Sequence, residues 1–351
     1  MKRSPDFATR VVRWQRAHGR HGLPWQNTRD AYRVWLSEVM LQQTQVATVI
    51  PYYERFLARF PGVADLARAS EEEVLALWSG LGYYARGRNL LRAALAVVER
   101  HEGRFPVRFE DLVELPGVGR STAGAIAAIA GGERRAILDG NVRRVLARHA
   151  GVDGDPASTR VNARLWEVAE ERLPQRSIET YTQGMMDLGA QVCTARNPAC
   201  GTCPVASDCV ARLEDRVAEL PGRKARAPAR RKRVAMLVVV RHGEVLLQKR
   251  PPTGIWGGLW SLPETAADAD PARALRHDWG LATASKSALP AFEHAFTHFT
   301  LEVTPWLLHP RGTATLATES RALWLPLSEI AGAALPSPIK KLLTGLRLAM
   351  G

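Results

Sequence analysis

The hydrophobic pattern of this chain changes its period once, and that change limits the folds it can adopt. Within residues 1–220, apolar positions recur at three- and four-residue steps, which is typical of helices. Over residues 34–60 they predict one helix that runs up to Pro51 and a second beyond it. Within residues 234–351, β-branched and aromatic runs predict strands, beginning with a hairpin around His242-Gly243. A short helix is predicted over 271–280 and a last one over 337–350. The basic, proline-containing segment 221–233 predicts a linker. The sequence therefore predicts a multidomain protein, with an all-α module followed by an α+β module.

A glycine turn and an isolated acid lie close together in the first module. Gly117 and Gly119 flank Val118, and the apolar run after them predicts a helix that begins at the turn. Such a turn presents backbone N–H groups and a positive helix end to an anion, which points to a backbone phosphate. Asp139 follows one helix later, before the helix-like run 141–150. The alternative for both features is structural, as a helix connector and an N-cap.

The charge balance favours a polyanionic partner. The 351 residues carry 48 lysines and arginines against 35 aspartates and glutamates, a net charge of +13. An arginine-rich proteome would give the same balance, so charge alone does not identify the partner. No apolar run reaches the roughly 18 residues of a membrane-spanning helix, and the amino end lacks the apolar centre of a signal peptide. We therefore expect a cytoplasmic protein without membrane attachment.

All four cysteines lie in one short segment, in the pattern Cys193-x6-Cys200-x2-Cys203-x5-Cys209. Disulfide-forming cysteines usually staple distant segments of a secreted protein, so metal ligation is the better account. Zinc sites more often carry two C-x2-C pairs, whereas this segment has one pair and two wider gaps. The spacing favours an iron–sulfur cluster and leaves zinc as the alternative.

One carboxylate stands inside an apolar helical stretch. Glu38 has Trp35, Val39 and Met40 beside it, and an apolar setting raises the pKa of a carboxyl group, so Glu38 is a candidate general acid. The alternative is a solvated glutamate on the polar face of the helix. If the reaction is departure of a base from deoxyribose, the base needs a proton and the sugar cation needs an anion. Glu38 and Asp139 would meet these two needs.

Several motifs together resemble those of one enzyme family. They are LPWQ (23–26), SEVMLQQTQV (37–46), GLGYYARGRNL (80–90), LPGVGRSTAGAI (115–126), LDGNVRRVLAR (138–148), MMDLGAQVC (185–193) and GIWGGLWSLPE (254–264). Spread over nearly the whole chain, they resemble the adenine-specific mismatch DNA glycosylases of the MutY type, within the helix-hairpin-helix glycosylase superfamily.

The resemblance implies a helical module of two lobes, a six-helix lobe at about 30–137 and a second lobe formed by the N-terminal helix and about 138–220. It implies a [4Fe–4S] cluster on the four cysteines of the loop 193–209. It also implies that the enzyme flips an adenine paired with 8-oxoguanine or guanine in double-stranded DNA and hydrolyses its N-glycosidic bond. We expect a monomer associated with the nucleoid.

The resemblance also implies roles for single residues. Glu38 matches the acid that protonates adenine N7 and later handles the water, and Asp139 matches the carboxylate that stabilises the cationic sugar. The other matched residues contact DNA: Gln43, Thr44, Leu81 and Tyr83 in the opened base stack, Gly117, Val118 and Gly119 at a phosphate, and Phe296, Thr297 and His298 at 8-oxoguanine. The family usually has serine where this chain has Thr297. Ordinary packing is the alternative, for Leu81 in particular.

Ser121 bears on the type of reaction. The related bifunctional glycosylases carry a lysine at this position, which forms a Schiff base with the sugar, and serine cannot form one. Arg143 stands where many family members have a lysine implicated in incidental trapping, and an arginine stays protonated. The resemblance therefore implies a monofunctional glycosylase that leaves an abasic site, with little or no lyase activity.

The second module resembles a Nudix fold, which makes pyrophosphate hydrolysis the rival activity. Gly258-x5-Glu264 matches the start of the Nudix box. Ala274 and His277 stand where later carboxylates should be, and Asp278 alone remains. Too few oxygen ligands are left for Mg²⁺, so we expect a lesion-recognition domain without this catalysis. A further alternative is an iron–sulfur protein that scans DNA without cutting it, against which the two candidate catalytic carboxylates argue.

Overall fold

The computed structural model describes residues 6–222, 230–311 and 322–350. Its internal contacts divide it into two compact units, which are described separately. The first unit comprises Met1–Arg68 and Asn89–Ala225, and the second comprises Ala69–Arg88 and Arg226–Gly351. The short segment Ala69–Arg88 thus groups with the C-terminal residues, although the sequence analysis had placed it in the six-helix lobe.

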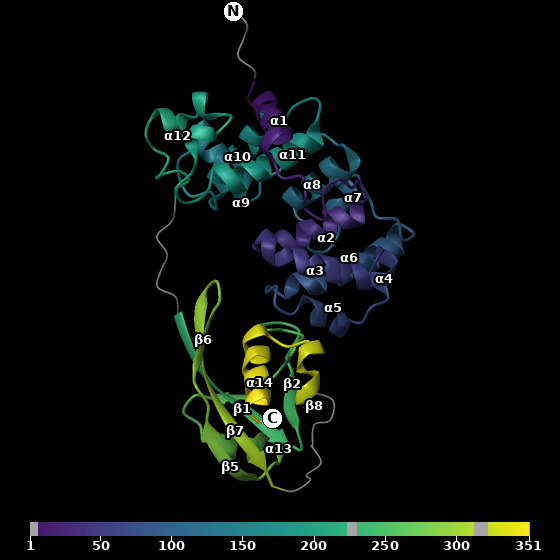
Figure 1. Cartoon of the computed structure of the whole chain (residues 1–351), viewed down its shortest axis with the longest axis vertical. Helices are drawn as coiled ribbons and strands as arrows, with labels where there is room; N and C mark the ends of the chain where they lie inside the picture. Colours follow the sequence, from purple (N-terminus) through teal and green to yellow (C-terminus); the bar gives the residue numbers. More distant parts are fainter. Residues whose placement is uncertain (1–5, 223–229, 312–321, 351) are drawn as a thin grey trace, which may run out of the picture. The chain divides into compact units, whose positions relative to one another are not determined.

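The first unit is helical, as its apolar period predicted. Its α-helices are α1 (Phe7–His18), α2 (Ala31–Leu41), α3 (Val46–Arg59), α4 (Val63–Ala67), most of α6 (Ala85–Arg100), α7 (Phe109–Val113), α8 (Arg120–Gly131), α9 (Gly140–Ala150), α10 (Thr159–Glu171), α11 (Ile178–Asp187) and α12 (Val210–Leu213). The N-terminal helix α1 packs among the late helices α9, α10 and α11 (Figure 1), since Phe7 and Val11 share a buried core with Leu165 and Tyr181. None of the described helices combines the length and apolarity that a membrane crossing needs.

The break between α2 and α3 lies at residues 42–45, and the predicted break at Pro51 is wrong. Gln43 adopts a left-handed backbone with φ +59°, which stops α2, and α3 then starts at Val46. Pro51 lies in the second turn of α3, where its missing N–H removes one backbone hydrogen bond without ending the helix. The break therefore places an exposed turn immediately after the helix that carries Glu38.

The glycine turn and the isolated acid lie where the sequence placed them relative to α8 and α9. Gly119 is the N-cap of α8, and Gly132 ends the helix with a left-handed backbone at φ +66°. Asp139 is the N-cap of α9, and its side chain accepts a hydrogen bond from the Val142 N–H. The chain between the two helices is short, so the turn and the acid are held on consecutive elements.

The second unit contains the helix α5 (Glu71–Trp78) and a mixed sheet, as expected for an α+β module. The strands are β1 (Arg230–Arg241), β2 (Glu244–Lys249), β3 (Trp260–Ser261), β4 (Glu264–Ala266), β5 (Thr283–Ala288), β6 (Phe292–Ala295), β7 (Phe299–Pro310) and β8 (Ala322–Pro326). Their main order is β3-β2-β1-β7-β5, with β4 on β1, β6 on β7 and β8 on β2. The β1–β7 pair is parallel and the other pairs are antiparallel.

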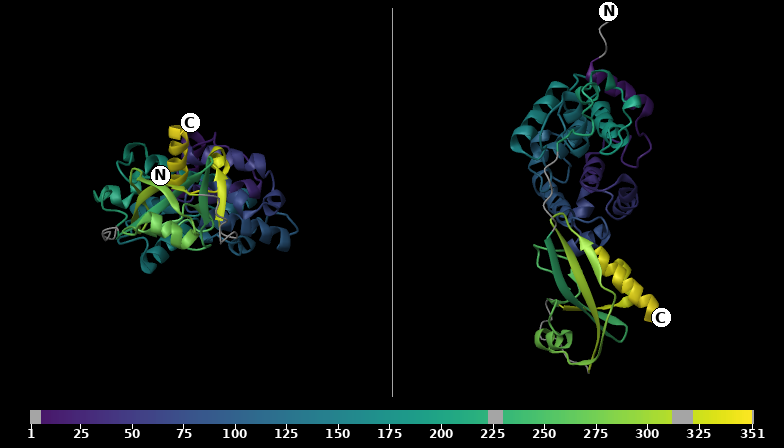
Figure 2. Two further views of the ribbon diagram at one scale, coloured as in Figure 1. Left: turned by 90° about the horizontal axis from the view of Figure 1, so that it is seen from below. Right: turned by 90° about the vertical axis from the view of Figure 1, so that its left-hand side faces the viewer.

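Two helices cover this sheet. The helix α13 (Pro271–Trp279) buries Leu275 and Trp279 against Leu237 of β1 and Leu308 of β7. The C-terminal helix α14 (Ser337–Met350) lies on the other side of the sheet (Figure 2). Both helices and the hairpin at His242-Gly243 were predicted from the sequence, and the structure confirms them.

The first strand begins inside the segment that the sequence analysis assigned to the linker. Arg230 is paired with Phe299 of β7, and Arg233 is paired with Glu302. The Arg233 side chain also forms an ion pair with Glu302 at 3.0 Å. Strand pairing and opposite charge on β7 therefore bring 230–233 into the sheet, and 223–229 lie outside the described residues.

Candidate active site

Glu38 lies on α2 between buried apolar residues. Trp35 and Val39 on either side of it belong to the core, while Glu38 itself is half-buried and borders two cavities. Burial, and then the negative charge of Asp139, raise the pKa of Glu38 to about 8. A carboxyl group with this pKa carries its proton at neutral pH, as a general acid requires.

Asp139 is both a helix cap and a half-buried acid. Its Oδ1 accepts a hydrogen bond from the Val142 N–H at 2.7 Å. The pKa of Asp139 is raised, chiefly by burial, although the backbone N–H groups of Val142 and Asn141 and the charges of Arg144 and Arg143 act in the opposite direction. These groups favour the ionised form of Asp139, whereas the two influences on its neighbour at α2 both favour the proton. The two carboxyl groups therefore differ in their surroundings, since only Asp139 has partners that favour its ionised form.

The first cavity joins the two carboxylates and measures about 480 Å³. Glu38, Asp139, Ser121 and Thr44 line it. The Ser121 hydroxyl accepts a hydrogen bond from the Leu138 N–H at 2.9 Å, so Ser121 fixes the segment that leads into Asp139. The cavity therefore brings together four of the residues predicted from sequence.

The second cavity, of about 530 Å³, shares Glu38 and Arg20 with the first. Trp25, Gln26 and Gln183 also line it, and the sequence analysis gave them no role. Trp25 and Gln26 belong to the LPWQ motif, whereas Gln183 lies two residues before the MMDLGAQVC motif and carried no signal of its own. A ring and two amides can stack on a flat base and exchange hydrogen bonds with its edge.

A buried carboxylate fixes one side of this second cavity. Asp187 is fully buried. Its carboxylate accepts hydrogen bonds from the Arg20 Nε at 2.6 Å and from the Arg20 backbone N–H at 3.0 Å. It also accepts a hydrogen bond from the Gln183 Nε2 at 2.9 Å. Since Asp187 anchors both side chains, the polar wall of the cavity is preorganised.

Each residue of the glycine turn 117–119 has a different structural part. Gly117 has φ +79°, and a Cβ there would lie 2.8 Å from the Asn89 Cβ, so only glycine fits. The Val118 side chain is buried and its N–H bonds to the Leu115 carbonyl at 3.0 Å, so Val118 shapes the turn. Gly119 has no side chain with which to cap α8, which leaves the positive start of that helix for an anion.

The four cysteines line a common cavity on the loop between α11 and α12, together with Arg148. Arg148 Nη1 lies 3.4 Å from Cys193 Sγ and can donate to a thiolate ligand. Within the described residues, no three His, Cys, Asp or Glu side chains converge as ligands of one metal ion. Four cysteine sulfurs around one cavity form a ligand set that fits an iron–sulfur cluster.

Phe296, Thr297 and His298 form a loop between β6 and β7 in the second unit. Phe296 is stacked on Phe299 with centroids 4.6 Å apart, and the His294 ring meets its edge at 4.7 Å. Thr297 and His298 are exposed. Phe296 therefore anchors the loop, and the two residues after it are available to a ligand.

The residues matched to the opened base stack differ in exposure. Tyr83 is 49% exposed, and its hydroxyl lies 3.3 Å from Thr297 Oγ1 within the second unit. Gln43 is exposed at the turn after α2, while Thr44 is half-buried. Leu81 is only 6% exposed, so packing accounts for it in the structure as it stands.

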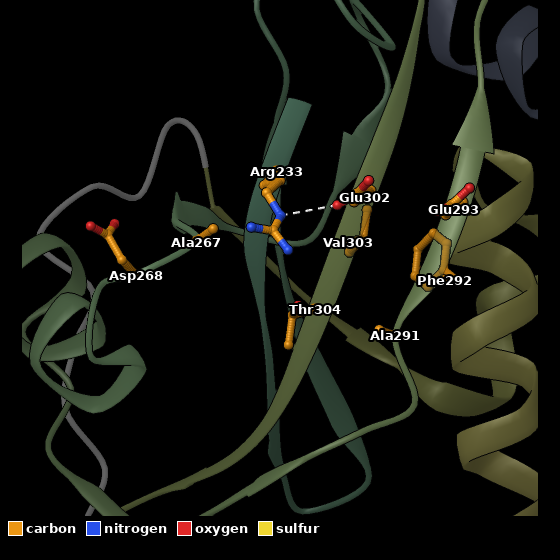
Figure 3. A pocket seen from close by; sticks show the side chains of 9 residues that line it. All are labelled: Arg233, Ala267, Asp268, Ala291, Phe292, Glu293, Glu302, Val303 and Thr304. Carbon is orange, nitrogen blue, oxygen red and sulfur yellow. Dashed lines mark hydrogen bonds and ion pairs between the residues drawn. The ribbon is translucent and has the colours of Figure 1, made fainter. Parts of the chain in front are cut away.

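The remaining carboxylates of the Nudix box have protein partners or lie on the surface. Glu264 forms an ion pair with Arg250 at 3.0 Å, and Asp278 lies 2.6 Å from the exposed His277. A separate cavity of about 550 Å³ opens on the sheet, where Arg233 is paired with Glu302 (Figure 3). Neither Glu264 nor Asp278 lines it. Loss of pyrophosphate hydrolysis stays a prediction that this arrangement supports.

Three family models match the chain. Residues 36–171 match the HhH-GPD superfamily of base excision DNA repair proteins. Residues 193–209 match the iron–sulfur binding domain of endonuclease III, and residues 234–345 match the NUDIX domain. The matches follow the order of helical module, cysteine loop and α+β module.

Similar proteins cover the chain almost completely. An adenine DNA glycosylase of Buchnera aphidicola subsp. Schizaphis graminum is 33% identical over 96% of this chain and 97% of its own length. An adenine DNA glycosylase of Mus musculus is 36% identical over 95% of this chain and 76% of its own length. Among solved structures, a thermostable thymine-DNA glycosylase is 27% identical, with a TM-score of 0.54 over 59% of this chain and 95% of its own.

Proposed function

Because the chain belongs to the adenine DNA glycosylases of the MutY type, a family of base-excision repair enzymes with a [4Fe–4S] cluster, we propose that it hydrolyses the N-glycosidic bond of adenine paired with 8-oxoguanine or guanine. The enzyme acts as a monomer at the nucleoid and leaves an abasic site. Glu38 carries this proposal, since it is shared by the amide-lined cavity and the cavity that contains Asp139.

The two cavities divide the flipped nucleotide between them. The adenine occupies the cavity of Trp25, Gln26 and Gln183, and the sugar faces Asp139 in the other. Glu38 gives its proton to the base as the C–N bond breaks, and the Asp139 carboxylate stabilises the resulting sugar cation. Water then bonds to the sugar carbon, and its proton returns to the Glu38 carboxylate.

The glycine turn and the cysteine loop serve DNA binding. The start of α8 after Gly119 holds a backbone phosphate, and Gln43, Thr44, Leu81 and Tyr83 enter the stack that the flipped base leaves. Leu81 must leave its packed position to do so. Cys193, Cys200, Cys203 and Cys209 hold the cluster, which when bound fixes the fold of this loop.

Lesion reading is assigned to Thr297 and His298, with Phe296 as their anchor. His298→Ala is expected to lower the preference for adenine opposite 8-oxoguanine over adenine opposite guanine about tenfold, equivalent to about 1.4 kcal/mol, because a hydrogen-bonding side chain at the lesion is removed. Single-turnover rates on the two duplexes measure this ratio, and an adenine·thymine duplex gives the background.

His242→Ala is the matched control, since His242 is an exposed histidine at the β1–β2 turn of the same unit. It should keep the wild-type ratio. A wild-type enzyme that releases adenine from the adenine·thymine duplex as fast as from the mismatches would refute the proposed substrate. Equal ratios in His298→Ala and wild type would remove His298 from lesion reading.

The wild-type enzyme is expected to show no borohydride trapping on substrate DNA above background. Ser121 cannot form a Schiff base, and the guanidinium of Arg143 stays protonated. Arg143→Lys places a primary amine near Asp139 and is expected to give a trapped complex on denaturing gels. If wild type is trapped as efficiently as this variant, the enzyme is not monofunctional.

A further inference from the structure

The segment Ala69–Arg88 carries Tyr83 but belongs by its contacts to the same unit as Thr297. It consists of α5, a loop with several unusual backbone angles, and the first turn of α6. Contacts at both of its ends connect it to the C-terminal residues, and hydrogen bonds within its loop hold the loop's shape. These contacts are not explained by catalysis at Glu38 and Asp139.

The amino end of α5 is bound through Glu72. Its Oε1 accepts a hydrogen bond from the Trp260 Nε1 at 2.6 Å, and its Oε2 lies 3.4 Å from the Lys249 Nζ. The Lys249 ammonium also lies 4.7 Å from the centre of the Trp260 ring. One carboxylate thus receives two donors from strands β2 and β3, and its bond from the indole is short and charge-assisted.

The other end of the segment is bound through its loop and through α6. The Ser79 hydroxyl donates to the Leu335 carbonyl at 2.7 Å, and the Arg88 guanidinium donates to the Gly257 carbonyl. Glu71 is also close: a Cβ at Gly258 would lie 2.9 Å from its Oε1. Since Gly258 also has φ +78°, the backbone there is suited to the approach of α5.

Hydrogen bonds within the loop 79–84 and to its flanking residues hold its shape, so the position of α5 determines the position of Tyr83. The Trp78 Nε1 donates to the Gly82 carbonyl at 3.0 Å, and Arg86 donates to the Leu81 carbonyl at 3.1 Å. The Arg86 guanidinium also lies 5.5 Å from the centre of the Tyr83 ring. With these bonds formed, the Tyr83 hydroxyl reaches Thr297 Oγ1.

We infer that Glu72 and Trp260 are a pair of positioning residues for lesion discrimination, because their hydrogen bond ties the segment that presents Tyr83 to the domain that presents Thr297. The inference rests on the proposed reading of 8-oxoguanine by Thr297 and His298. It assigns the pair no contact with DNA and no part in bond breaking. A lesion is then read by one rigid surface made of two chain segments that are distant in sequence.

Three substitutions separate the parts of this contact. Glu72→Ala removes the acceptor, Glu72→Gln keeps a carbonyl oxygen for the indole, and Trp260→Phe keeps a ring but removes the donor. Glu72→Ala and Trp260→Phe are each expected to lower the ratio of single-turnover rates for 8-oxoguanine over guanine duplexes about three- to tenfold, by the loss of a charge-assisted hydrogen bond. Glu72→Gln should retain most of the ratio, and the double variant should lose no more than either single variant.

Hydrogen–deuterium exchange provides the second measurement on the full-length protein. Amides in 79–88 are expected to exchange faster in Glu72→Ala and at the wild-type rate in Glu99→Gln, which makes the same loss of charge at an exposed site on α6. Unchanged exchange in Glu72→Ala overturns the inference, whatever the substrate preference. A wild-type ratio in Glu72→Ala also overturns it, while a wild-type enzyme without lesion preference contradicts the proposed function instead.

Discussion

Asp139→Asn is expected to slow adenine release about a thousandfold while α9 keeps its cap. Asparagine caps helices about as well as aspartate, so the hydrogen bond from the Val142 N–H survives and only the charge is lost. At about 4 Å and an effective dielectric constant of about 20, attraction between the carboxylate and a sugar cation is about 4 kcal/mol. If it acts only in the transition state, its loss slows the reaction by about three orders of magnitude.

The matched control is Asp30→Asn. Asp30 is the N-cap of α2 and accepts from the Tyr32 N–H at 2.9 Å, so the same change removes a capping charge from another helix of the first unit. Single-turnover rates under enzyme excess compare the two variants, and thermal unfolding compares their stability. If both variants lose activity equally, loss of a capping charge from any helix accounts for the effect, and the proposed stabilisation of the sugar cation by Asp139 is wrong.

Local signals were sufficient for most of the fold. The glycine turn, the N-cap at Asp139 and the hairpin at His242-Gly243 each depend on a few adjacent residues, and all were found where the sequence placed them. The break between α2 and α3 was predicted at Pro51, because proline usually interrupts a helix, whereas it lies at the left-handed Gln43. Nothing in a single sequence marks Gln43 for φ +59°, since that conformation is rare outside glycine and asparagine.

The sequence marked the proposed reacting groups more clearly than the groups that surround them. Glu38 stood out as a single charge in an apolar helix, and this burial is what raises its pKa. Gln26 lies in the segment before α2 and Gln183 lies on α11, and both line the second cavity. No local sequence pattern connects residues so far apart. Likewise, the grouping of Ala69–Arg88 with the C-terminal unit depends on contacts such as Glu72 with Trp260, which are visible only in three dimensions.

Glu38→Gln is expected to reduce adenine release by about two to four orders of magnitude, because the amide cannot deliver a proton to the leaving base. The wild-type rate of adenine release, where it depends on ionisation of the free enzyme, should fall as the pH rises through about 8, because the Glu38 carboxyl loses its proton there. Single-turnover rates from pH 6 to pH 9, at enzyme concentrations well below saturation so that the rate reports ionisation of the free enzyme, measure both effects. A wild-type rate that stays constant through about pH 8, or a variant as active as wild type, would remove Glu38 from the role of acid.

The same substitution should make the protein more stable at alkaline pH. The pKa of Glu38 is raised in the folded state from 4.5 to about 8, so between these values the folded state holds a proton that the unfolded state releases. Stability from Glu38 is therefore complete below about pH 4.5 and is lost as the pH rises towards 8, whereas glutamine has no proton to lose. Thermal unfolding at pH 5 and pH 8 should show a Tm advantage of Glu38→Gln that is larger at pH 8. An equal difference at both pH values would mean that Glu38 ionises normally and cannot arrive protonated at the base.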